Sequence, residues 1–208
     1  MRRIGHRGAK GHAPENTIAS FQRALDLGCD EVETDVWLVA DGRLVISHDR
    51  PGAGPNTTLT LEEMLDFCRG RLGVNVELKA EASERDARET GARVGALIAK
   101  RGDPDVYVSS FWWAALEAAR DAAPAVRRAF LYSAAPERRA LFRSSREIAL
   151  WALHPNRSYV TEELVAEAHR EGLRMNVWTV NEESEMKAFA GWGVDGIMSD
   201  YPERIPKS

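Results

Sequence analysis

Short apolar runs and longer amphipathic segments alternate along the whole chain. The apolar runs are typical of buried strands, because valine, isoleucine and leucine cluster in them between turn signals. Strands are predicted at residues 3–8, 31–36, 74–79, 106–109, 126–132, 148–153, 174–180 and 196–199. The segments between them place apolar residues at helical spacing. Helices are predicted at residues 14–27, from residue 60 onward, and at 83–100, 113–122, 136–143, 161–171 and 182–192.

Regular alternation of strand and helix implies parallel strands that are joined by right-handed helical crossovers. Eight such units are what a closed (β/α)8 TIM barrel requires. At 208 residues the chain is near the lower limit for that barrel, so short helices and short loops are expected. No linker, repeat or low-complexity segment interrupts the alternation. We therefore predict a compact α/β TIM barrel that forms a single domain over residues 1–208.

The second predicted strand carries carboxylates where a buried strand is normally apolar. Glu33 and Asp35 are two residues apart, so their side chains share one strand face and lie about 7 Å apart. The Asp41-Gly42 pair then predicts a tight turn, and the hairpin it forms returns His48 toward the acids. Glu77 adds a third carboxylate on the polar face of the next strand. Acids on an exposed edge strand are common, so this pattern alone does not identify a site.

The predicted barrel favours the interpretation of these acids as part of a site, because the C-terminal ends of barrel strands line the active site. His6, Glu33, Asp35, Glu77 and Lys79 all fall at or near such ends. Burying several carboxylates together is costly without a positive charge between them. The three acids therefore predict a bound cation, and oxygen ligands alone favour Mg²⁺, Ca²⁺ or Mn²⁺ over Zn²⁺.

Basic side chains and histidines complete the candidate chemistry. Arg7 and Lys79 predict a local positive pocket that suits a phosphate group. His6 and His48 carry imidazoles, which titrate near neutral pH. One histidine can remove a proton from an attacking oxygen while the other protonates the leaving alkoxide. The set is typical of a metal-dependent phosphoester hydrolase.

Five motifs resemble those of the glycerophosphodiester phosphodiesterase family. They are GHRGAKGHAPENT at residues 5–17, EVETDVWLVADGRLVISHD at 31–49, NVELK at 75–79, MNVWTVN at 175–181 and GVDGIMSDYP at 193–202. Their order and spacing match across essentially the whole chain. The resemblance implies the barrel fold, dependence on a divalent metal, and hydrolysis of glycerophosphodiesters to sn-glycerol 3-phosphate and an alcohol.

The same resemblance implies roles for individual residues. It implies metal ligation by Glu33, Asp35 and Glu77. It implies acid-base catalysis by His6 and His48, and a catalytic contact of Arg7 with the phosphate. Lys79 and Trp178 stand at positions where the family binds substrate.

One segment departs from the family pattern. Many relatives follow the His-Asp pair with a longer stretch that contains Arg-Thr-Thr, whereas this chain has only RPGAGPNTT before its next helix. A shorter loop over the site predicts a more open pocket that accepts alcohols of different sizes.

Composition limits the partners and the compartment. The net charge of −4 gives no overall attraction to nucleic acid or to anionic membranes. No apolar run of about 18 residues and no apolar leader are found, so stable membrane insertion and export are not expected. Cys29 and Cys68 have no disulfide-type or metal-type spacing and are interpreted as reduced, packed thiols. These features favour the cytoplasm; the oligomeric state stays open.

Several residues near the motifs have plainer interpretations. Glu15 and Asn16 are interpreted as helix-start residues, and Asn181 as a helix cap. Turn or capping roles are expected for Asp195 and Asp200. His154, at the end of a predicted strand, is either a pocket residue or an ordinary loop histidine. Of the aromatic run Phe111-Trp112-Trp113 at another strand end, one is expected to rim the site and the others to pack on helices.

Two other functions fit the same motifs. A lysophospholipase D, or a related sphingomyelinase D, would share the two histidines and the acidic metal site. Such an enzyme needs an apolar landing surface for acyl chains, and residues 50–60 contain no evident apolar patch. A barrel that binds a metal or a phosphoester without turnover is the third alternative, although the complete set of histidines, acids and arginine argues for catalysis.

Overall fold

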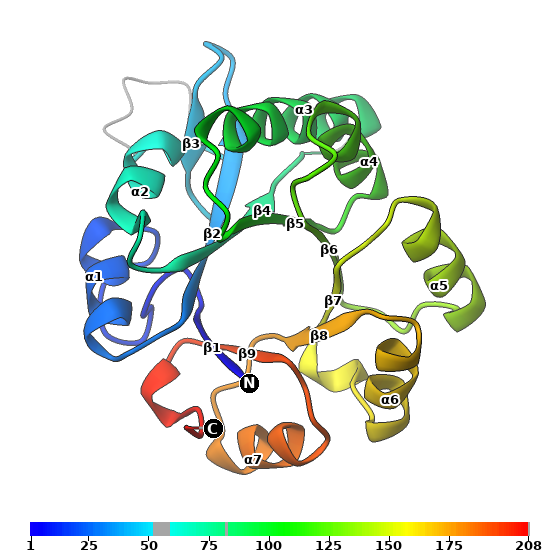
Figure 1. Ribbon diagram of the computed structural model, residues 1–208. Coiled ribbons are helices and arrows are strands. Elements are labelled where there is room, and N and C mark those ends of the chain that lie inside the picture. Colours follow the sequence, from blue (N-terminus) through cyan, green and yellow to red (C-terminus); the bar gives the residue numbers. More distant parts are fainter. Residues whose placement is uncertain (52–58, 82, 208) are drawn as a thin grey trace.

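A barrel of short strands forms the centre of the molecule, and helices surround it (Figure 1). The computed structural model describes residues 1–51, 59–81 and 83–207. The strands are β1 (Arg2–Gly5), β2 (Glu31–Leu38), β3 (Leu44–Ile46), β4 (Gly73–Leu78), β5 (Val106–Ser110), β6 (Arg128–Tyr132), β7 (Ala152–Pro155), β8 (Arg174–Val177) and β9 (Gly196–Ser199). The helices are α1 (Ile18–Asp26), α2 (Leu61–Cys68), α3 (Glu84–Arg101), α4 (Trp113–Ala122), α5 (Arg138–Glu147), α6 (Glu162–Arg170) and α7 (Glu183–Gly191), with short 3₁₀ turns η1 (Arg157–Tyr159) and η2 (Pro202–Arg204).

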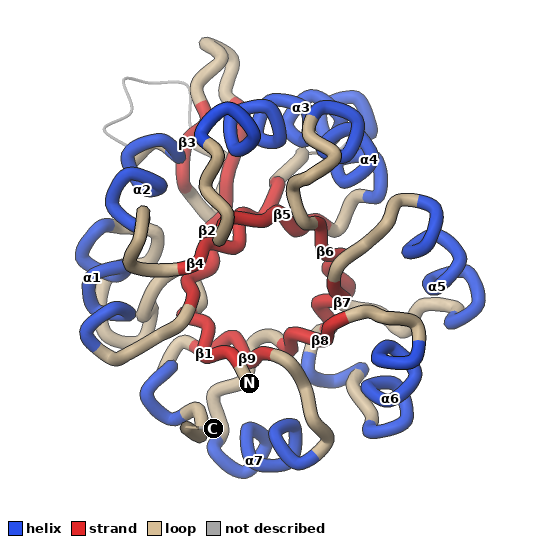
Figure 2. The backbone as a smooth tube through the Cα atoms, viewed as in Figure 1, coloured by secondary structure: helices blue, strands red, loops and turns tan. Residues whose placement is uncertain are grey.

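The strands form one closed ring, which Figure 2 shows nearly end on. Their order is β1-β9-β8-β7-β6-β5-β4-β2-β3, and pairing between β1 and β2 closes the ring. Eight strands of the described residues run parallel, whereas β3 pairs antiparallel with β2 as a hairpin beside the ring. The predicted (β/α)8 barrel and the predicted hairpin are confirmed, and all the chemistry-bearing loops follow the same ends of the strands.

Three predicted strands differ from the structure by three or four residues at one end, and the others by two or fewer. The first ends at Gly5, because Arg7 adopts a left-handed φ of 51° and turns the chain. The strand predicted at 148–153 begins at Ala152, because α5 continues to Glu147 and residues 148–150 form the turn that ends it. The strand predicted at 174–180 ends at Val177. Most of the loop predicted at 50–60 lies outside the described residues, so that prediction is not tested.

Capping residues set where the helices begin. The Thr60 hydroxyl accepts a hydrogen bond from the Glu63 backbone N–H, and the Glu63 carboxylate accepts one from the Thr60 N–H. This reciprocal pair is a capping box, and it satisfies backbone donors that the first turn leaves free. Thr17 and Ser83 cap α1 and α3 in the same way with a single bond. The helix starts therefore lie at the C-terminal ends of the barrel strands, next to the candidate site.

A close contact between α3 and α4 covers one side of the barrel. Gly91 and Gly95 of α3 face the backbone of Ala115 and Ala119 in α4. A Cβ at Gly91 would lie 2.1 Å from the Ala115 carbonyl oxygen, well inside van der Waals contact. The absence of a side chain at Gly91 is what permits the two helices to approach. No helix of the described residues is long and apolar enough to cross a membrane.

Substituting this glycine should destabilise the fold. We expect Gly91→Ala to lower the free energy of unfolding by about 1–3 kcal/mol, despite the higher helix propensity of alanine, because the helices must move apart. Urea unfolding followed by circular dichroism measures this change. Gly191→Ala is the matched control, since a Cβ at Gly191 has no neighbour within 4 Å. Equal stability of the two variants would show that the α3–α4 contact is not tight.

Candidate active site

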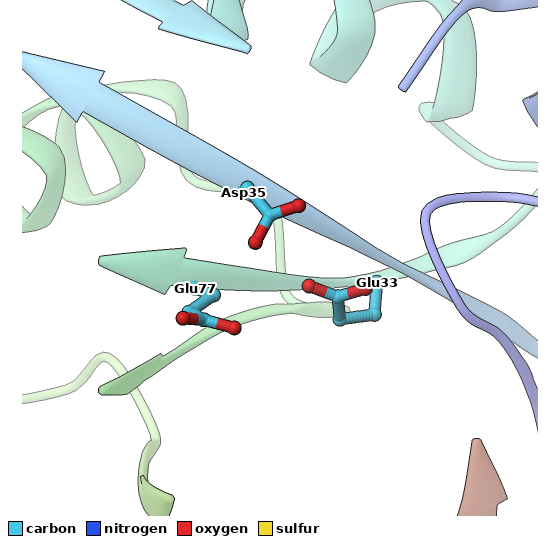
Figure 3. Close-up of side chains that lie close together, drawn as sticks. All are labelled: Glu33, Asp35 and Glu77. Atoms are coloured by element: carbon cyan, nitrogen blue, oxygen red, sulfur yellow. The ribbon is translucent and has the colours of Figure 1, made fainter. Parts of the chain in front are cut away.

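Strand register brings the three predicted acids together at one end of the barrel. Asp35 of β2 is paired with Glu77 of β4, and Glu33 lies two residues before Asp35 on the same face. One carboxylate oxygen from each residue lies within 4.8 Å of the other two (Figure 3). Glu33 and Asp35 are 3% and 0% exposed. Neighbouring strands therefore build a compact, desolvated cluster of carboxylates, as the sequence predicts.

Two basic side chains partly neutralise this cluster. The Arg7 guanidinium Nε lies 3.1 Å from Asp35 Oδ2, and the Arg7 backbone N–H donates a 3.0 Å hydrogen bond to Glu33 Oε2. Lys79 Nζ lies 3.0 Å from Glu77 Oε1 and 3.2 Å from Asp35 Oδ1. Arg7 and Lys79 thus lie where the sequence places them, beside the acids. Two basic groups face three carboxylates, of which Glu33 and Asp35 are buried and Glu77 is partly exposed, and this leaves an excess of negative charge.

Burial and mutual repulsion shift the protonation of the acids. Burial, together with the charge of Asp35, raises the pKa of Glu77 to about 7 even though Lys79 opposes the shift. Burial and the charges of Asp35 and Glu77 raise the pKa of Glu33 well above its usual value. Such shifts mark carboxylates that lack sufficient positive charge around them. A cation bound between the three carboxylates would supply this positive charge and would therefore lower the pKa of both Glu33 and Glu77.

The oxygen atoms of the cluster fit a hard divalent cation. Glu33 Oε1 is buried and accepts no hydrogen bond from any residue that the structure describes, and Asp35 Oδ1 has only the Lys79 ammonium beside it, at 3.2 Å. Buried polar atoms of this kind normally have a partner. Three carboxylates with converging oxygens are the donor set that Mg²⁺ and Ca²⁺ prefer. The residues present therefore fit such an ion.

His6 lies beside the acids and is held by the other end of the chain. Its Nδ1 is 2.7 Å from Asp200 Oδ1, and its Nε2 is 4.0 Å from Glu33 Oε2. Asn181 donates a 2.9 Å hydrogen bond to the other oxygen of Asp200. Burial would raise the pKa of Asp200, but the bonds from His6 and Asn181 keep it below its usual value. Asp200 therefore fixes the orientation of the imidazole.

The structure gives Asp200 and Asn181 other contacts than the turn and capping roles expected from the sequence. Asn181 does not cap α7 through its side chain; its amide binds Asp200 and Ser199 instead. Both residues stand in the motifs at 175–181 and 193–202, and a polar residue just after a barrel strand was the available signal. Asp195 bonds His169 Nε2 and the Met175 backbone N–H, far from the acids in the fold, at the start of the last strand.

Glu15 and Asn16 lie before α1, which begins at Ile18 with Thr17 as its N-cap, so the helix predicted from residue 14 starts later in the structure. The two residues contact the site instead. Asn16 donates a 2.9 Å hydrogen bond to Asp35 Oδ2 and accepts one from Thr34. Glu15 accepts two hydrogen bonds of 3.1 Å from Arg7 Nη1. The interpretation of these two residues as mere helix-start residues is therefore wrong. They hold Asp35 and Arg7 in place from the loop that follows β1.

His48 lies farther out than His6. Its side chain is 41% exposed, and its Nδ1 is 2.9 Å from Asp49 Oδ1. The Ser47 backbone N–H donates a 3.1 Å hydrogen bond to the Asp35 carbonyl, which ties the end of the hairpin to the acid strand. His48 lines a cavity of about 650 Å³ with Glu15 and Asn16. Within the described residues no direct contact joins His48 to the acids or to His6.

Two aromatic side chains meet at the same end of the barrel. Trp178 follows β8 and donates a 2.7 Å hydrogen bond from its indole N–H to the His154 carbonyl oxygen. Phe111 follows β5 and meets Trp178 edge to face, with 5.6 Å between ring centroids. His154 itself is fully buried inside the barrel, where burial lowers its pKa to about 3. His154 is therefore neither a loop histidine nor a catalytic acid or base.

Comparison with known proteins places this geometry in a family. A sequence model described as the glycerophosphoryl diester phosphodiesterase family matches residues 6–52 and 52–204. The chain belongs to this family.

Relatives of the glycerophosphoryl diester phosphodiesterase family match almost the whole chain. A glycerophosphodiester phosphodiesterase of Caldanaerobacter subterraneus is 30% identical over 236 residues, which is 97% of this chain and 95% of the relative. A phosphodiesterase of Oleispira antarctica, solved in complex with the product sn-glycerol-3-phosphate, superposes with a TM-score of 0.85 and 30% identity. That comparison covers 97% of this chain and 94% of the other. A Silicibacter pomeroyi glycerophosphoryl diester phosphodiesterase, named as putative, gives a TM-score of 0.85 at 29% identity and covers 97% and 90% of the two chains.

The acid cluster predicts how stability of this family member depends on pH without metal. The raised pKa of Glu77, about 7, lets the folded protein keep a proton that the unfolded chain releases above about pH 4.5. That stabilisation is complete below pH 4.5 and is lost as the pH rises through 7. Glu77→Gln stays neutral, so we expect its unfolding free energy to fall less between pH 5 and 8, by on the order of 2 kcal/mol.

Urea unfolding at several pH values, with chelator present throughout, measures this difference. Glu62→Gln, an exposed change on α2, is the control for losing one surface carboxylate. Parallel pH profiles for the parent and Glu77→Gln would contradict the raised pKa.

Proposed function

We propose that this protein hydrolyses glycerophosphodiesters to sn-glycerol 3-phosphate and an alcohol, with a divalent cation as cofactor. The observation that carries the proposal is the buried cluster of Glu33, Asp35 and Glu77 with His6 at its edge. Family membership and the product complex of the Oleispira relative support the substrate class. No nucleic acid is expected as a partner, and the oligomeric state is left open.

Glu33, Asp35 and Glu77 would hold the cation through their converging oxygens. Mg²⁺, Ca²⁺ and Mn²⁺ all suit this donor set. When bound, the ion supplies positive charge that stabilises the negative charge on the phosphoryl oxygens. Arg7 and Lys79 add positive charge on the same side, and Asn16 keeps Asp35 oriented. Trp178 offers an apolar wall to the glycerol carbons.

His6 is assigned as the general base. Its Nδ1–H donates to Asp200, which leaves the lone pair on Nε2 free and directed toward the acid cluster. The Nε2 atom takes the proton from the attacking oxygen, which belongs either to water or to a neighbouring hydroxyl of the substrate. His48, on the open side of the barrel end, is assigned as the acid that protonates the leaving alkoxide.

Buried thiols agree with a cytoplasmic setting. Cys29 and Cys68 are both unpaired and buried, and burial raises the pKa of each to about 12. Such thiols remain protonated and unreactive. We propose that the protein acts in the cytoplasm, where it would recover phosphate and glycerol from the head groups of phospholipids.

A lysophospholipid substrate is the second candidate function. The exposed large apolar side chains of the described residues are Ile18, Phe111 and Tyr159, at 37%, 39% and 36% exposure. Each follows the C-terminal end of a barrel strand, on the same side of the molecule as the acids. That placement offers some apolar surface to an acyl chain beside the site. The three are separate residues rather than one continuous patch, so small water-soluble diesters remain the first proposal.

Product release tests the reaction class. We expect sn-glycerol 3-phosphate from glycerophosphocholine and glycerophosphoethanolamine with Mg²⁺ or Ca²⁺, and none with chelator. His48→Ala should lower kcat by about 10²- to 10⁴-fold, because the leaving alkoxide loses its acid. His169→Ala, an exposed histidine on α6, is the control and should keep full activity. Release that continues in chelator, or an unchanged His48→Ala enzyme, would overturn the proposal.

A substrate with a good leaving group tests the assignment of the histidines. Nitrophenolate needs no protonation to leave, so glycerophospho-4-nitrophenol should restore most of the activity of His48→Ala. The same substrate should leave His6→Ala impaired, because the attacking oxygen still needs a base. Steady-state rates of both variants on both substrates give the comparison. Recovery of His6→Ala alone would reverse the two roles.

A substrate panel tests the open pocket. We expect kcat/KM values for small and bulky alcohols, such as choline and inositol, to agree within about tenfold, a difference of about 1.4 kcal/mol. Strong preference for one small alcohol would rule out a permissive pocket. Lysophosphatidylcholine belongs in the same panel, with Phe111→Ala as the matched variant. Faster hydrolysis of that lipid than of glycerophosphocholine, lost in Phe111→Ala, would favour the second candidate.

A further inference from the structure

The inside of the barrel is polar directly beneath the acid cluster. Residues paired across parallel strands share a face, so the faces can be followed from strand to strand. Glu33 is paired with Asn75, Glu77 with Ser109, and Leu131 with His154. Because Glu33 and Glu77 face the barrel axis, Asn75 and Ser109 face it as well. The 5.9 Å edge-to-face contact between the rings of Tyr107 and His154 places His154 in the same interior.

These interior groups are buried without protein partners. Asn75, Ser109 and His154 are all 0% exposed. Both amide atoms of Asn75, Ser109 Oγ and His154 Nδ1 make no hydrogen bond to any residue within the described parts of the chain. Glu33 Oε1, on the strand paired with that of Asn75, is in the same condition. A buried polar atom without a partner costs a sizeable part of the small net stability of a domain. Buried polar atoms normally have a partner, so these groups call for one beyond the described residues.

The hydrogen on His154 can be placed from its neighbours. Burial lowers the pKa of His154 to about 3, so the ring is neutral near pH 7. Its Nε2 lies 3.0 Å from the amide nitrogen of Asn176, which can only donate, so Nε2 accepts. The ring hydrogen is therefore on Nδ1, which becomes a buried donor with no acceptor. The interior thus holds donors on His154 and Asn75, acceptors on Asn75 and Glu33, and a hydroxyl on Ser109 that serves as either.

Small residues stand among these groups. Ala129 and Ala152 occupy the neighbouring interior positions, and both are fully buried beside Tyr107. Asn176 lies over Gly196, where its Oδ1 occupies the place of a side chain. A water molecule with two to four polar partners is the usual occupant of such a space.

We propose that ordered water on the barrel axis bridges Asn75, Ser109 and His154, and that Asn75 positions Glu33 through this water. The water accepts from His154 Nδ1–H, exchanges hydrogen bonds with Ser109, and pairs with the Asn75 amide. Asn75 is the pairing partner of Glu33 on the adjacent strand, so its amide faces the free oxygen Glu33 Oε1 through this water. The proposed water site does not depend on the proposed function, whereas the positioning role of Asn75 rests on the proposed cation site.

Asn75→Leu tests the proposal because it keeps the shape and removes both polar atoms. A dry interior would become more stable when an unpartnered amide is removed. In a hydrated interior the substitution removes a hydrogen-bond partner of the water that serves Ser109 and His154. We therefore expect Asn75→Leu to have a lower Tm than the parent protein when both are measured in chelator. We also expect the Kd for Mg²⁺ or Ca²⁺, measured by calorimetry, to rise about tenfold or more, as for other residues that orient metal ligands. Asn75→Ser, which keeps a hydroxyl and room for water, should restore part of both values.

A crystal structure of the parent with ordered solvent gives the direct observation. Water within hydrogen-bond distance of Ser109 Oγ and His154 Nδ1 is expected. An interior without water, or a higher Tm for Asn75→Leu, would overturn the water site. Water present with an unchanged cation Kd in Asn75→Leu would overturn the positioning role alone. Should Asn75→Leu fail to fold, Ser109→Ala takes its place with the same expected directions. The Tm and the crystal structure need no cation, so their failure is distinct from failure of the proposed function.

Discussion

The repulsion between three closely spaced carboxylates, two of them buried, is the constraint around which the active site is built. Parallel register places Glu33, Asp35 and Glu77 together, and the closed ring keeps bulk water away from them. Their charges cannot spread into solvent, so burial raises the pKa of Glu33 and Glu77. The basic side chains of Arg7 and Lys79 neutralise part of this negative charge. A divalent cation is the simplest way to balance the rest.

Loops from distant parts of the chain supply the side chains that bind these carboxylates and orient His6. The loop after β1 turns at Arg7, so that its backbone N–H binds Glu33 while its guanidinium reaches Asp35. The last strand brings Asp200 to His6, which joins the two ends of the chain at the site. Pairing of β1 with both β9 and β2 therefore completes the site as well as the ring. Fold and chemistry depend on the same strand pairing.

Much of the fold and part of the candidate site could be predicted from patterns that are local in the sequence. Alternation of side chains predicted the shared face of Glu33 and Asp35, and the helix predicted from residue 60 onward is α2, with Thr60 as its N-cap. The contacts of Asp200 and Asn16 were missed, because each depends on a partner far away in the chain and each residue has an ordinary local role. The start of β7 was misplaced because residues 148–150 are apolar yet form the turn that ends α5. Apolar character alone does not separate a buried turn from a strand.

The most direct test of the account is a calorimetric titration of Mg²⁺ or Ca²⁺ into chelator-treated, dialysed protein in two buffers of different ionisation enthalpy. Carboxylates with raised pKa values carry protons that a cation must displace, so binding should release protons near pH 7. We expect one cation per chain with measurable proton release, and weaker binding with less release in Glu77→Gln. No binding, or binding that is the same in Glu77→Gln, would contradict the claim that these carboxylates form the cation site.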